Sequence, residues 1–330
     1  MAEHPVPIRF LSKTQTEALL TWSDVVEAVD AVFRSDGRGD LITPKKDPIR
    51  MDDGRSMLMA MPGYLRDMGV AGMKWMRSYP FKPDGIPQLW AQLLIISDAA
   101  TGLPTGVMDA TTVTAMRTAG GHGVVAAKYL AKKSSRVLCV TGSGAQAKAG
   151  IQSFDAAFDL DEIRVWSPHL ADKKDAFAAS LGALRARLTL CGKADELYDG
   201  CDILLTTTAH RGEPFLDAKR LPAGCFVSSM TSFYEFGTQI LDTADKWVLG
   251  HRLSDTLQIL EDRSFAGQLP PEKVYGTLGE IAAGRLPGRE SDSEILLYTH
   301  MGMGAFDVAI GQRLLEKAAA QGVGTELDLI

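Results

Sequence analysis

Residues 136–251 alternate between short apolar runs and amphipathic helical segments, and this alternation constrains the fold more than any other feature. The apolar runs lie at 136–142, 162–167, 187–191, 201–208, 224–230 and 246–251. Apolar strands that alternate with helices are typical of a parallel sheet covered on both faces. We therefore expect an α/β fold with a Rossmann-type doubly wound parallel sheet.

A glycine-rich turn follows the first of these runs. Gly142 and Gly144 are succeeded by Ala147, and a helical segment opens at Ala145 and Gln146. The first glycine permits a tight turn, the second lets a pyrophosphate approach the backbone, and the small third residue allows close packing of helix on strand. The free N–H groups at the start of such a helix bind phosphate. In this setting the turn predicts a dinucleotide-binding site.

The turn lacks the acidic residue that usually accompanies it. That acid lies about 20 residues further on and binds the 2′-hydroxyl of the ribose. Here Ser167 ends the second apolar run, His169 stands beside it, and Lys173 and Lys174 follow. These side chains could accommodate a 2′-phosphate that a carboxylate would repel, although the lysines could equally form a solvated helix face. The sequence favours NADP(H) over NAD(H).

The first third of the chain is organised differently. Apolar residues recur at helical spacing over 14–35, while 56–65, 70–79 and 89–109 have the character of strands. The last of these contains two strands joined by the turn DAATG. We expect an antiparallel or mixed sheet here. The amphipathic helix expected over 301–321 returns to this part of the chain.

Composition and charge argue against several functions. The net charge of −6 is spread along the chain, which disfavours nucleic acid or an anionic membrane as partner. No signal-peptide pattern and no run of eighteen apolar residues occurs, so we expect a cytoplasmic protein. The four cysteines are far apart and form no metal-binding spacing. We expect them to be buried, and we expect no metal.

Four segments together resemble the ornithine cyclodeaminase/mu-crystallin family. They lie at 106–131, 140–147, 201–208 and 278–295, and the resemblance extends from about residue 44 to the end. It implies a substrate-binding and dimerisation domain, completed by the C-terminal helix, and a Rossmann domain that binds NAD(P). We place the first domain at 1–118 and 306–330 and the second at 119–305, and we expect a homodimer.

The resemblance also implies substrate-binding residues. Lys74 stands where family members place a lysine that contacts the substrate carboxylate or assists proton transfer, and Arg117 matches an arginine that clamps this carboxylate. An arginine is also common near 44–50, where Lys46 is the best match and Arg50 the second. Arg117 could instead form an ordinary ion pair, and Lys46 and Arg50 could belong to a solvated face.

Further assignments lie near the ends of other expected strands. Thr207 and Thr208 match positions that contact the cofactor, and Gly302 and Gly304 would let the start of the last helix approach the nicotinamide. His300 is a candidate substrate-binding residue because its ordinary pKa suits proton transfer near neutrality. The alternative is a structural histidine.

One position departs from the family pattern. Many cyclodeaminases and alanine dehydrogenases carry an aspartate just after the strand that corresponds to 224–230, where it stabilises the developing iminium. Phe233 occupies that position here, and Glu235 follows two residues later. Glu235 could take the place of the aspartate if the loop shifts, but we expect it to be exposed, as glutamates in loops generally are. The missing aspartate disfavours ornithine cyclisation but not redox chemistry.

These features predict an NAD(P)-dependent oxidoreductase that acts on the C–N bond of a small amino or imino acid by hydride transfer at the α-carbon. Lys74 would donate or accept the proton, with a lowered pKa if it is desolvated beside Arg117. Two alternatives remain open. One is an ornithine or lysine cyclodeaminase that releases ammonia with catalytic NAD, and the other is a non-catalytic NADPH-binding protein similar to mu-crystallin.

Overall fold

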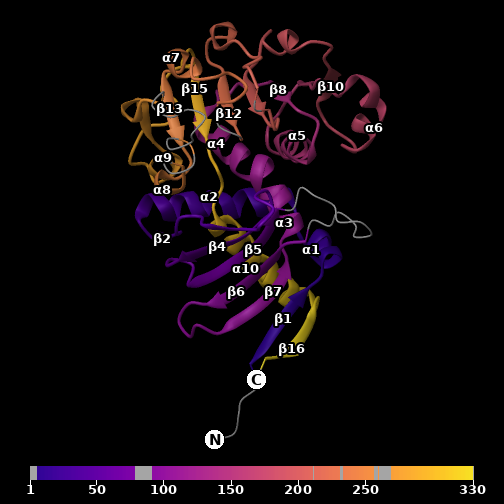
Figure 1. The fold of residues 1–330 in the computed structure, drawn as a ribbon, viewed down its shortest axis with the longest axis vertical. Coiled ribbons are helices and arrows are strands. Elements are labelled where there is room, and N and C mark those ends of the chain that lie inside the picture. Colours follow the sequence, from indigo (N-terminus) through magenta and orange to yellow (C-terminus); the bar gives the residue numbers. More distant parts are fainter. Residues whose placement is uncertain are drawn as a thin grey trace, which may run out of the picture. The chain divides into compact units, whose positions relative to one another are not determined.

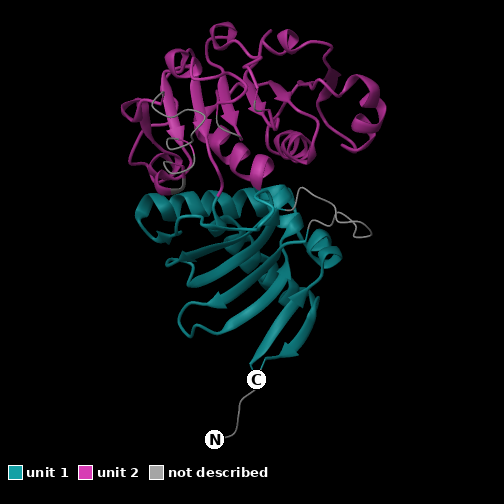
Figure 2. Cartoon of the chain, in the orientation of Figure 1, with its two compact units in different colours: residues 1–117, 303–330 teal, residues 118–302 magenta. Residues whose placement is uncertain are grey.

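The chain forms two compact units in a computed structural model that describes residues 6–78, 91–210, 212–230, 233–255, 259 and 269–329. Unit 1 comprises residues 1–117 and 303–330, and unit 2 comprises residues 118–302 (Figure 2). The last helix of the chain belongs to the unit built by the first third of the sequence.

Unit 1 is built on a mixed sheet (Figure 1). Its strands are β1 (Pro7–Leu11), β2 (Leu41–Ile42), β3 (Pro48–Arg50), β4 (Met57–Leu65), β5 (Val70–Ser78), β6 (Leu93–Asp98), β7 (Pro104–Asp109) and β16 (Thr325–Asp328). The order is β16-β1-β7-β6-β5-β4-β2, with β3 also on β4. The β1–β7 pair is parallel and the other pairs are antiparallel. This confirms the expected sheet type, and β6 and β7 are the two strands expected on either side of the DAATG turn.

The helical segment expected over 14–35 is interrupted. It forms α1 (Lys13–Leu19) and α2 (Trp22–Arg38), because Leu20 adopts an extended conformation between them. Thr21 then caps α2 in a reciprocal arrangement with Asp24. The apolar spacing continues across this break, but the capping hydrogen bonds of Thr21 and Asp24 start a second helix.

Helix α10 (Gly304–Gln321) packs against β4, β5, β6 and α2. Its first residue lies so close to β4 that a Cβ on Gly304 would come within 2.1 Å of the Met61 carbonyl oxygen. Only glycine permits this approach. The sequence feature that allows α10 to begin directly on the sheet is therefore Gly304.

Unit 2 is a doubly wound parallel sheet, which confirms the expected fold class. Its strands are β8 (Val137–Thr141), β9 (Glu162–Trp166), β10 (Arg187–Leu190), β11 (Ile203–Thr206), β12 (Phe226–Ser229), β13 (Lys246–Leu249), β14 (Val274–Thr277) and β15 (Leu296–Thr299). They lie in the order β10-β9-β8-β11-β12-β15-β13-β14 and are all parallel. The direction in which successive strands are added to the sheet reverses between β8 and β11. Strands β11 and β12 are buried at every position.

The α-helices of unit 2 are α4 (Gly123–Leu130), α5 (Ala145–Ala157), α6 (Lys174–Ala179), α7 (Ile240–Thr243), α8 (Arg252–Asp255) and α9 (Leu278–Ala282). Helix α4 continues from two helical pieces that precede it, α3 (Thr111–Ala115) of unit 1 and a π-helical stretch at Met116–His122. A π-helical stretch is rare and occurs often at functional sites. Here it contains Arg117.

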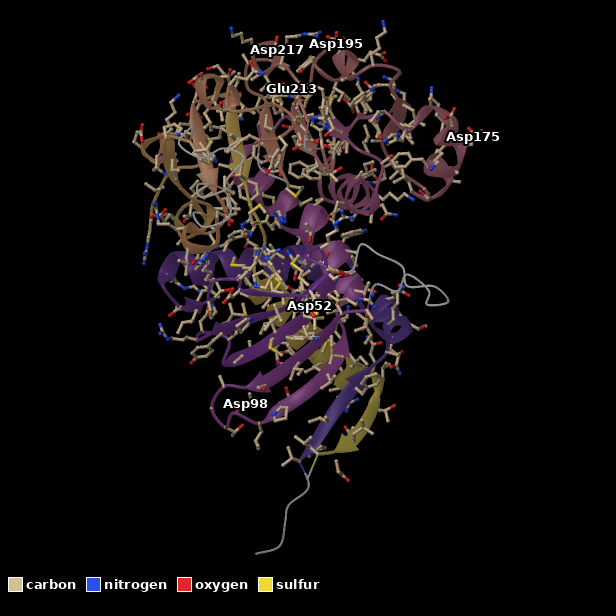
Figure 3. The ribbon with its side chains drawn as sticks, viewed as in Figure 1. Asp52, Asp98, Asp175, Asp195, Glu213 and Asp217 are labelled. Atoms are coloured by element: carbon tan, nitrogen blue, oxygen red, sulfur yellow. The ribbon has the colours of Figure 1, made fainter. Side chains whose placement is uncertain are left out.

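The structure shows where the cysteines and the acidic residues lie. All four cysteines are free and buried, as the sequence predicted. Acidic side chains are dispersed over both units, as the six labelled in Figure 3 illustrate: Asp52, Asp98, Asp175, Asp195, Glu213 and Asp217. Within the residues described, no helix is long and apolar enough to cross a bilayer, and no group of three or more His, Cys, Asp or Glu side chains could hold a metal ion.

Candidate active site

Unit 1 buries three charged side chains together. Lys74, on β5, is fully buried, and its Nζ lies 3.1 Å from Asp307 Oδ1 and 3.0 Å from Asp307 Oδ2. The Nε of Arg117, a residue only 6% exposed, lies 3.5 Å from Asp307 Oδ2. Two basic groups and one acidic group leave an excess positive charge where water is almost excluded. Such a cluster favours an anionic ligand.

The sheet register and the start of α10 create this cluster. Met61 on β4 pairs directly with Lys74 on β5. Gly304 rests on Met61, and Asp307 follows one helical turn later on the same face of α10. The close approach that Gly304 allows therefore brings the Asp307 carboxylate to the Lys74 ammonium.

Neutral groups complete the surroundings of Lys74. Its Nζ donates to Thr114 Oγ1 at 3.1 Å, and the Thr114 hydroxyl donates to Gln92 Oε1 at 2.7 Å. Burial and the charge of Arg117 lower the pKa of Lys74 from 10.5 to about 8, although Asp307 opposes this shift. The predicted lowering of the Lys74 pKa beside Arg117 is confirmed. At this pKa the ammonium can exchange its proton near neutral pH.

The sequence reasoning missed Asp307. The segment GAFDVAIG was interpreted only as an amphipathic helix, yet Phe306, Asp307 and Val308 are all fully buried. A carboxylate within an apolar helical stretch requires a buried partner, and this signal could have indicated a basic residue opposite it.

The other two basic candidates lie near β3. Lys46 is half-buried in the segment before this strand, and Arg50 is exposed on the strand itself. Arg50 pairs with Met57 at the start of β4. Their roles in substrate binding stay predictions.

In unit 2, the glycine turn joins β8 to α5. Gly142 has φ +103°, and a Cβ there would lie 2.6 Å from Thr207 Oγ1, so both backbone conformation and space require glycine. Gly144 is the N-cap of α5 and has no side chain to cap the free N–H groups of Ala145 and the following residues. The helix start can therefore bind an anion. Gln146 accepts a hydrogen bond from the Ala119 N–H at 2.9 Å.

A hydroxyl replaces the ribose-binding acid at the end of β9. Ser167 is buried at this strand end and accepts a hydrogen bond from the Ser143 hydroxyl of the glycine turn at 3.2 Å. His169, Lys173 and Lys174 are exposed. The Ser143–Ser167 hydrogen bond connects the turn to the β9 end without introducing a negative charge.

The residues after β11 lie against the glycine turn. The Thr207 hydroxyl donates to the carbonyl of Thr141, the last residue of β8, at 2.6 Å. The order of the sheet reverses between β8 and β11, and a dinucleotide binds outside the carboxyl ends of the strands at such a point. Thr207 and Thr208 thus lie beside the crevice that the fold offers to a dinucleotide.

The prediction that Glu235 is exposed was wrong, since its exposed fraction is 1%. It is buried because Thr141 and Thr208 hydrogen-bond to its carboxyl group. Phe233, at the position of the family aspartate, is buried in the hydrophobic core, with its ring 5.1 Å from that of Trp247. An aromatic core residue cannot supply the charge that the aspartate would provide.

His300 follows β15 and is buried within unit 2. Its Nδ1 lies 2.9 Å from Asp255 Oδ2, and its ring is 4.8 Å from that of His122. Burial raises the pKa of Asp255, but the charge of His300 and several hydrogen bonds together bring this pKa below its ordinary value. Gly302, two residues later, has φ +70°. The sequence reasoning did not identify Asp255 as the partner of His300.

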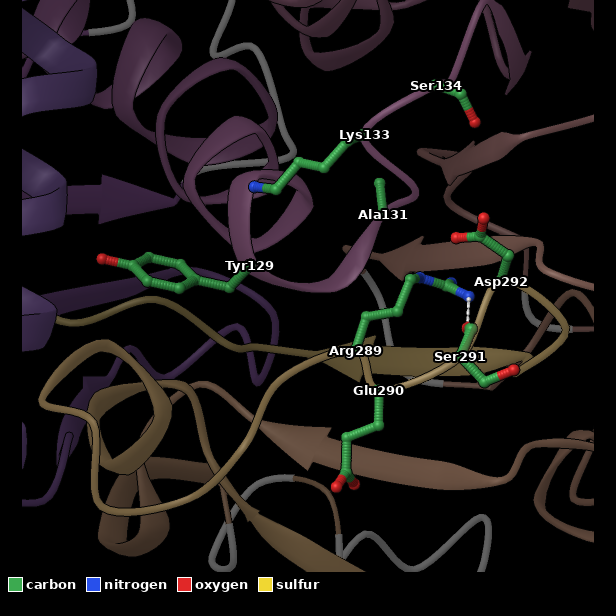
Figure 4. A pocket seen from close by; sticks show the side chains of 8 residues that line it. All are labelled: Tyr129, Ala131, Lys133, Ser134, Arg289, Glu290, Ser291 and Asp292. Atoms are coloured by element: carbon green, nitrogen blue, oxygen red, sulfur yellow. Dashed lines mark hydrogen bonds between the residues drawn. The ribbon is translucent and has the colours of Figure 1, made fainter.

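A separate cavity of about 540 Å³ lies elsewhere in unit 2 (Figure 4). Its lining comes from residues 129–134 and 289–292, which precede β8 and β15. The cavity is therefore at the amino ends of these strands. Ligands of doubly wound sheets bind at the carboxyl ends, so this cavity is not the dinucleotide crevice.

Comparison with known proteins gives consistent results. A model of the ornithine cyclodeaminase/mu-crystallin family matches residues 8–322. The alanine dehydrogenase of Archaeoglobus fulgidus is 32% identical over 328 residues, which cover 96% of this chain and 97% of that protein.

Two solved structures share the fold. An archaeal alanine dehydrogenase dimer with bound NAD has a TM-score of 0.85 at 30% identity, covering 98% of this chain and 100% of its own. The Δ1-pyrroline-2-carboxylate reductase of Thermococcus litoralis, in complex with NADH and L-proline, has a TM-score of 0.84 at 26% identity, covering 97% and 100%.

Proposed function

The chain belongs to the ornithine cyclodeaminase/mu-crystallin family, and we propose that it is an NAD(P)-dependent oxidoreductase acting on the C–N bond of an amino or imino acid. The observation that carries the proposal is the buried group of Lys74, Arg117 and Asp307. Its excess positive charge suits the carboxylate common to all α-amino and α-imino acids. Two of the similar proteins, an alanine dehydrogenase and a pyrroline-2-carboxylate reductase, act on this class of compound.

The residues of unit 1 supply binding and proton transfer. The Arg117 guanidinium binds the substrate carboxylate through charge-assisted hydrogen bonds. The Lys74 ammonium donates a proton in the reductive direction, and the neutral amine accepts one in the oxidative direction. Lys46 and Arg50 are further substrate-binding candidates, with His300 of unit 2. The nicotinamide cofactor, when bound, exchanges a hydride with the α-carbon.

Unit 2 has the features of a nicotinamide dinucleotide site. The residues that would hold the pyrophosphate are Gly142, Gly144, Ala145 and Gln146, and those that would bind the remaining parts are Ser167, His169, Thr207, Thr208 and Gly302. We infer a preference for NADP(H). The end of β9 carries a serine and exposed basic side chains, which would not repel a 2′-phosphate as a carboxylate would. The similar archaeal alanine dehydrogenase structure contains NAD, so the proposed preference is argued from the residues of this chain and not from that structure.

We assign substrate binding and dimerisation to unit 1 and cofactor binding to unit 2. A homodimer is supported by an apolar face on unit 1. Met73 pairs with Ile95, and Trp75 with Leu93, on adjacent strands β5 and β6, and none of these four side chains is buried in one chain. Leu93 is 38% exposed. Contiguous exposed apolar surface of this kind marks protein interfaces.

The proposal is tested by incubating the protein with NADPH or NADH and a panel of α-keto acids with ammonia or methylamine, together with cyclic imino acids. We expect loss of reduced nicotinamide absorbance with at least one pair, faster with NADPH. Lys74→Met should lower kcat/KM by about 10²–10⁴-fold, as loss of a general acid does. The absence of turnover with both cofactors over the whole panel would overturn the proposal.

The same assay separates the competing functions. A cyclodeaminase would release ammonia from ornithine or lysine with catalytic NAD and no net change in the cofactor. The buried Phe233 argues against this outcome. A non-catalytic member would bind NADPH tightly without turnover, and Lys74→Met would change nothing.

A further inference from the structure

Glu235 makes a buried connection that the proposed mechanism does not use. Its Oε1 accepts hydrogen bonds from the Thr141 hydroxyl at 2.8 Å, from the Thr208 N–H at 3.0 Å, and from the Thr208 hydroxyl. Its Oε2 is also buried and has no hydrogen-bond partner within the described part of the chain. Burying a carboxyl group costs free energy unless hydrogen bonds compensate, and here the compensating bonds are all made by Oε1.

The two partners of Glu235 lie on opposite walls of the dinucleotide crevice. Thr141 is the last residue of β8 and directly precedes Gly142 of the glycine turn. Thr208 lies two residues beyond the end of β11, the strand next to β8 at the reversal of the sheet order. Glu235 itself comes from the segment after β12. One carboxyl group thus joins the chain at the ends of β8 and β11 to the segment after β12, at the position where this fold binds its ligand.

The spacing between these walls is narrow and defined. Thr207 Oγ1 would lie 2.6 Å from a Cβ on Gly142, and it donates to the Thr141 carbonyl. A shift of either strand end by a fraction of an ångström would change the position of the glycine turn relative to Thr207 and Thr208. The Glu235 bridge restrains such a shift.

We propose that Glu235 is a positioning residue for dinucleotide binding, which holds the glycine turn and the Thr207–Thr208 segment at the spacing that the cofactor requires. The inference rests on the proposed function only in taking the ligand to be a nicotinamide dinucleotide. Glu235 acts through its threonine partners and does not itself touch the cofactor.

The bridge depends on Oε1 as the hydrogen-bond acceptor. Burial raises the pKa of Glu235, although the neighbouring threonines oppose the shift. Glutamine has the same shape and the same acceptor oxygen, so Glu235→Gln should preserve the bridge, whereas Glu235→Ala should remove it.

The test is the dissociation constant of NADPH, measured by its fluorescence on binding to the full chain. We expect Glu235→Gln to bind within about threefold of the unmodified protein, and Glu235→Ala to bind at least about tenfold more weakly, a loss of about 1.4 kcal/mol. Thr141→Val removes one donor while keeping the side-chain volume, and it should also weaken binding. This variant serves if Glu235→Ala does not fold.

Asp155→Ala is the matched control. Asp155 is a buried carboxylate of the same unit that accepts from the N–H groups of Arg185 and Ala186 at 2.9 Å each, on α5. It should lower thermal stability without weakening NADPH binding as Glu235→Ala does. Equal binding by Glu235→Ala and the unmodified protein, or loss of binding in Glu235→Gln, would overturn the inference. Failure of the unmodified protein to bind either dinucleotide would instead overturn the proposed function.

Discussion

The pKa of Lys74 depends on two neighbours of opposite charge. The guanidinium of Arg117 favours loss of the Lys74 proton, and the carboxylate of Asp307 favours its retention. The pKa of about 8 is the balance of these effects and of burial. A group with this pKa can both donate and accept a proton near neutral pH, as the proposed role of Lys74 requires.

Removal of the Asp307 charge should shift this balance. In the reductive direction Lys74 must be protonated, so kcat/KM of the unmodified enzyme should fall as pH rises through about 8. Asp307→Asn removes the group that raises the pKa of Lys74, so the fall should move to lower pH. The measurement is kcat/KM against pH for both proteins. Thr114→Val, which removes a neutral hydrogen-bond partner, is the control and should move the profile less; an unmoved profile in Asp307→Asn would contradict the role of Asp307.

The roles of single residues were the hardest to predict from sequence. Lys74 and Arg117 were identified from their family motifs, and the structure brings them to the same carboxylate. Asp307 was missed and the burial of Glu235 was predicted wrongly, because the place of each residue is defined by contacts with residues far away in the sequence. Glu235 follows an apolar strand in what reads as a polar loop, and only the facing threonines make its burial possible.

At the scale of elements, the β–α alternation predicted the strands of unit 2 well. Strands buried on both faces leave long apolar runs in the sequence, and the glycine turn marks the beginning of a helix unambiguously. The break between α1 and α2 and the π-helical stretch were missed. Both depend on a few hydrogen bonds that change the path of the backbone without disturbing the apolar periodicity.

The start of α10 offers a test at this scale. Gly304→Ala would place a Cβ only 2.1 Å from the Met61 carbonyl oxygen. This distance is too short for two atoms that are not bonded, so the helix must shift. We expect a loss of about 1–3 kcal/mol in the free energy of unfolding, measured with denaturant, and reduced kcat/KM because Asp307 moves away from Lys74. Gly123→Ala is the matched control at the first residue of α4, where a Cβ would make its nearest contact at 3.5 Å. Equal stability of the two variants would contradict the close approach.

At the scale of the whole molecule, we predict that two copies of the chain associate. The apolar face on β5 and β6 should be covered by a second copy of the chain. Ile95→Asp, which places a charge in the middle of this face, should convert a dimer to a monomer in light scattering during gel filtration. Leu103→Asp, in the turn after β6 where Leu103 is 42% exposed, should leave the mass unchanged. A dimer that persists in Ile95→Asp would place the interface elsewhere.

The division of unit 1 between the two ends of the sequence has a consequence for biosynthesis. Unit 2 is continuous, so every residue it needs has been translated before α10 leaves the ribosome. Unit 1 cannot complete its folding as early, because Lys74 lacks its buried counter-charge until Asp307 leaves the ribosome. The nascent chain can therefore complete the fold of unit 2 early, while the buried pair of Lys74 and Asp307 is assembled last.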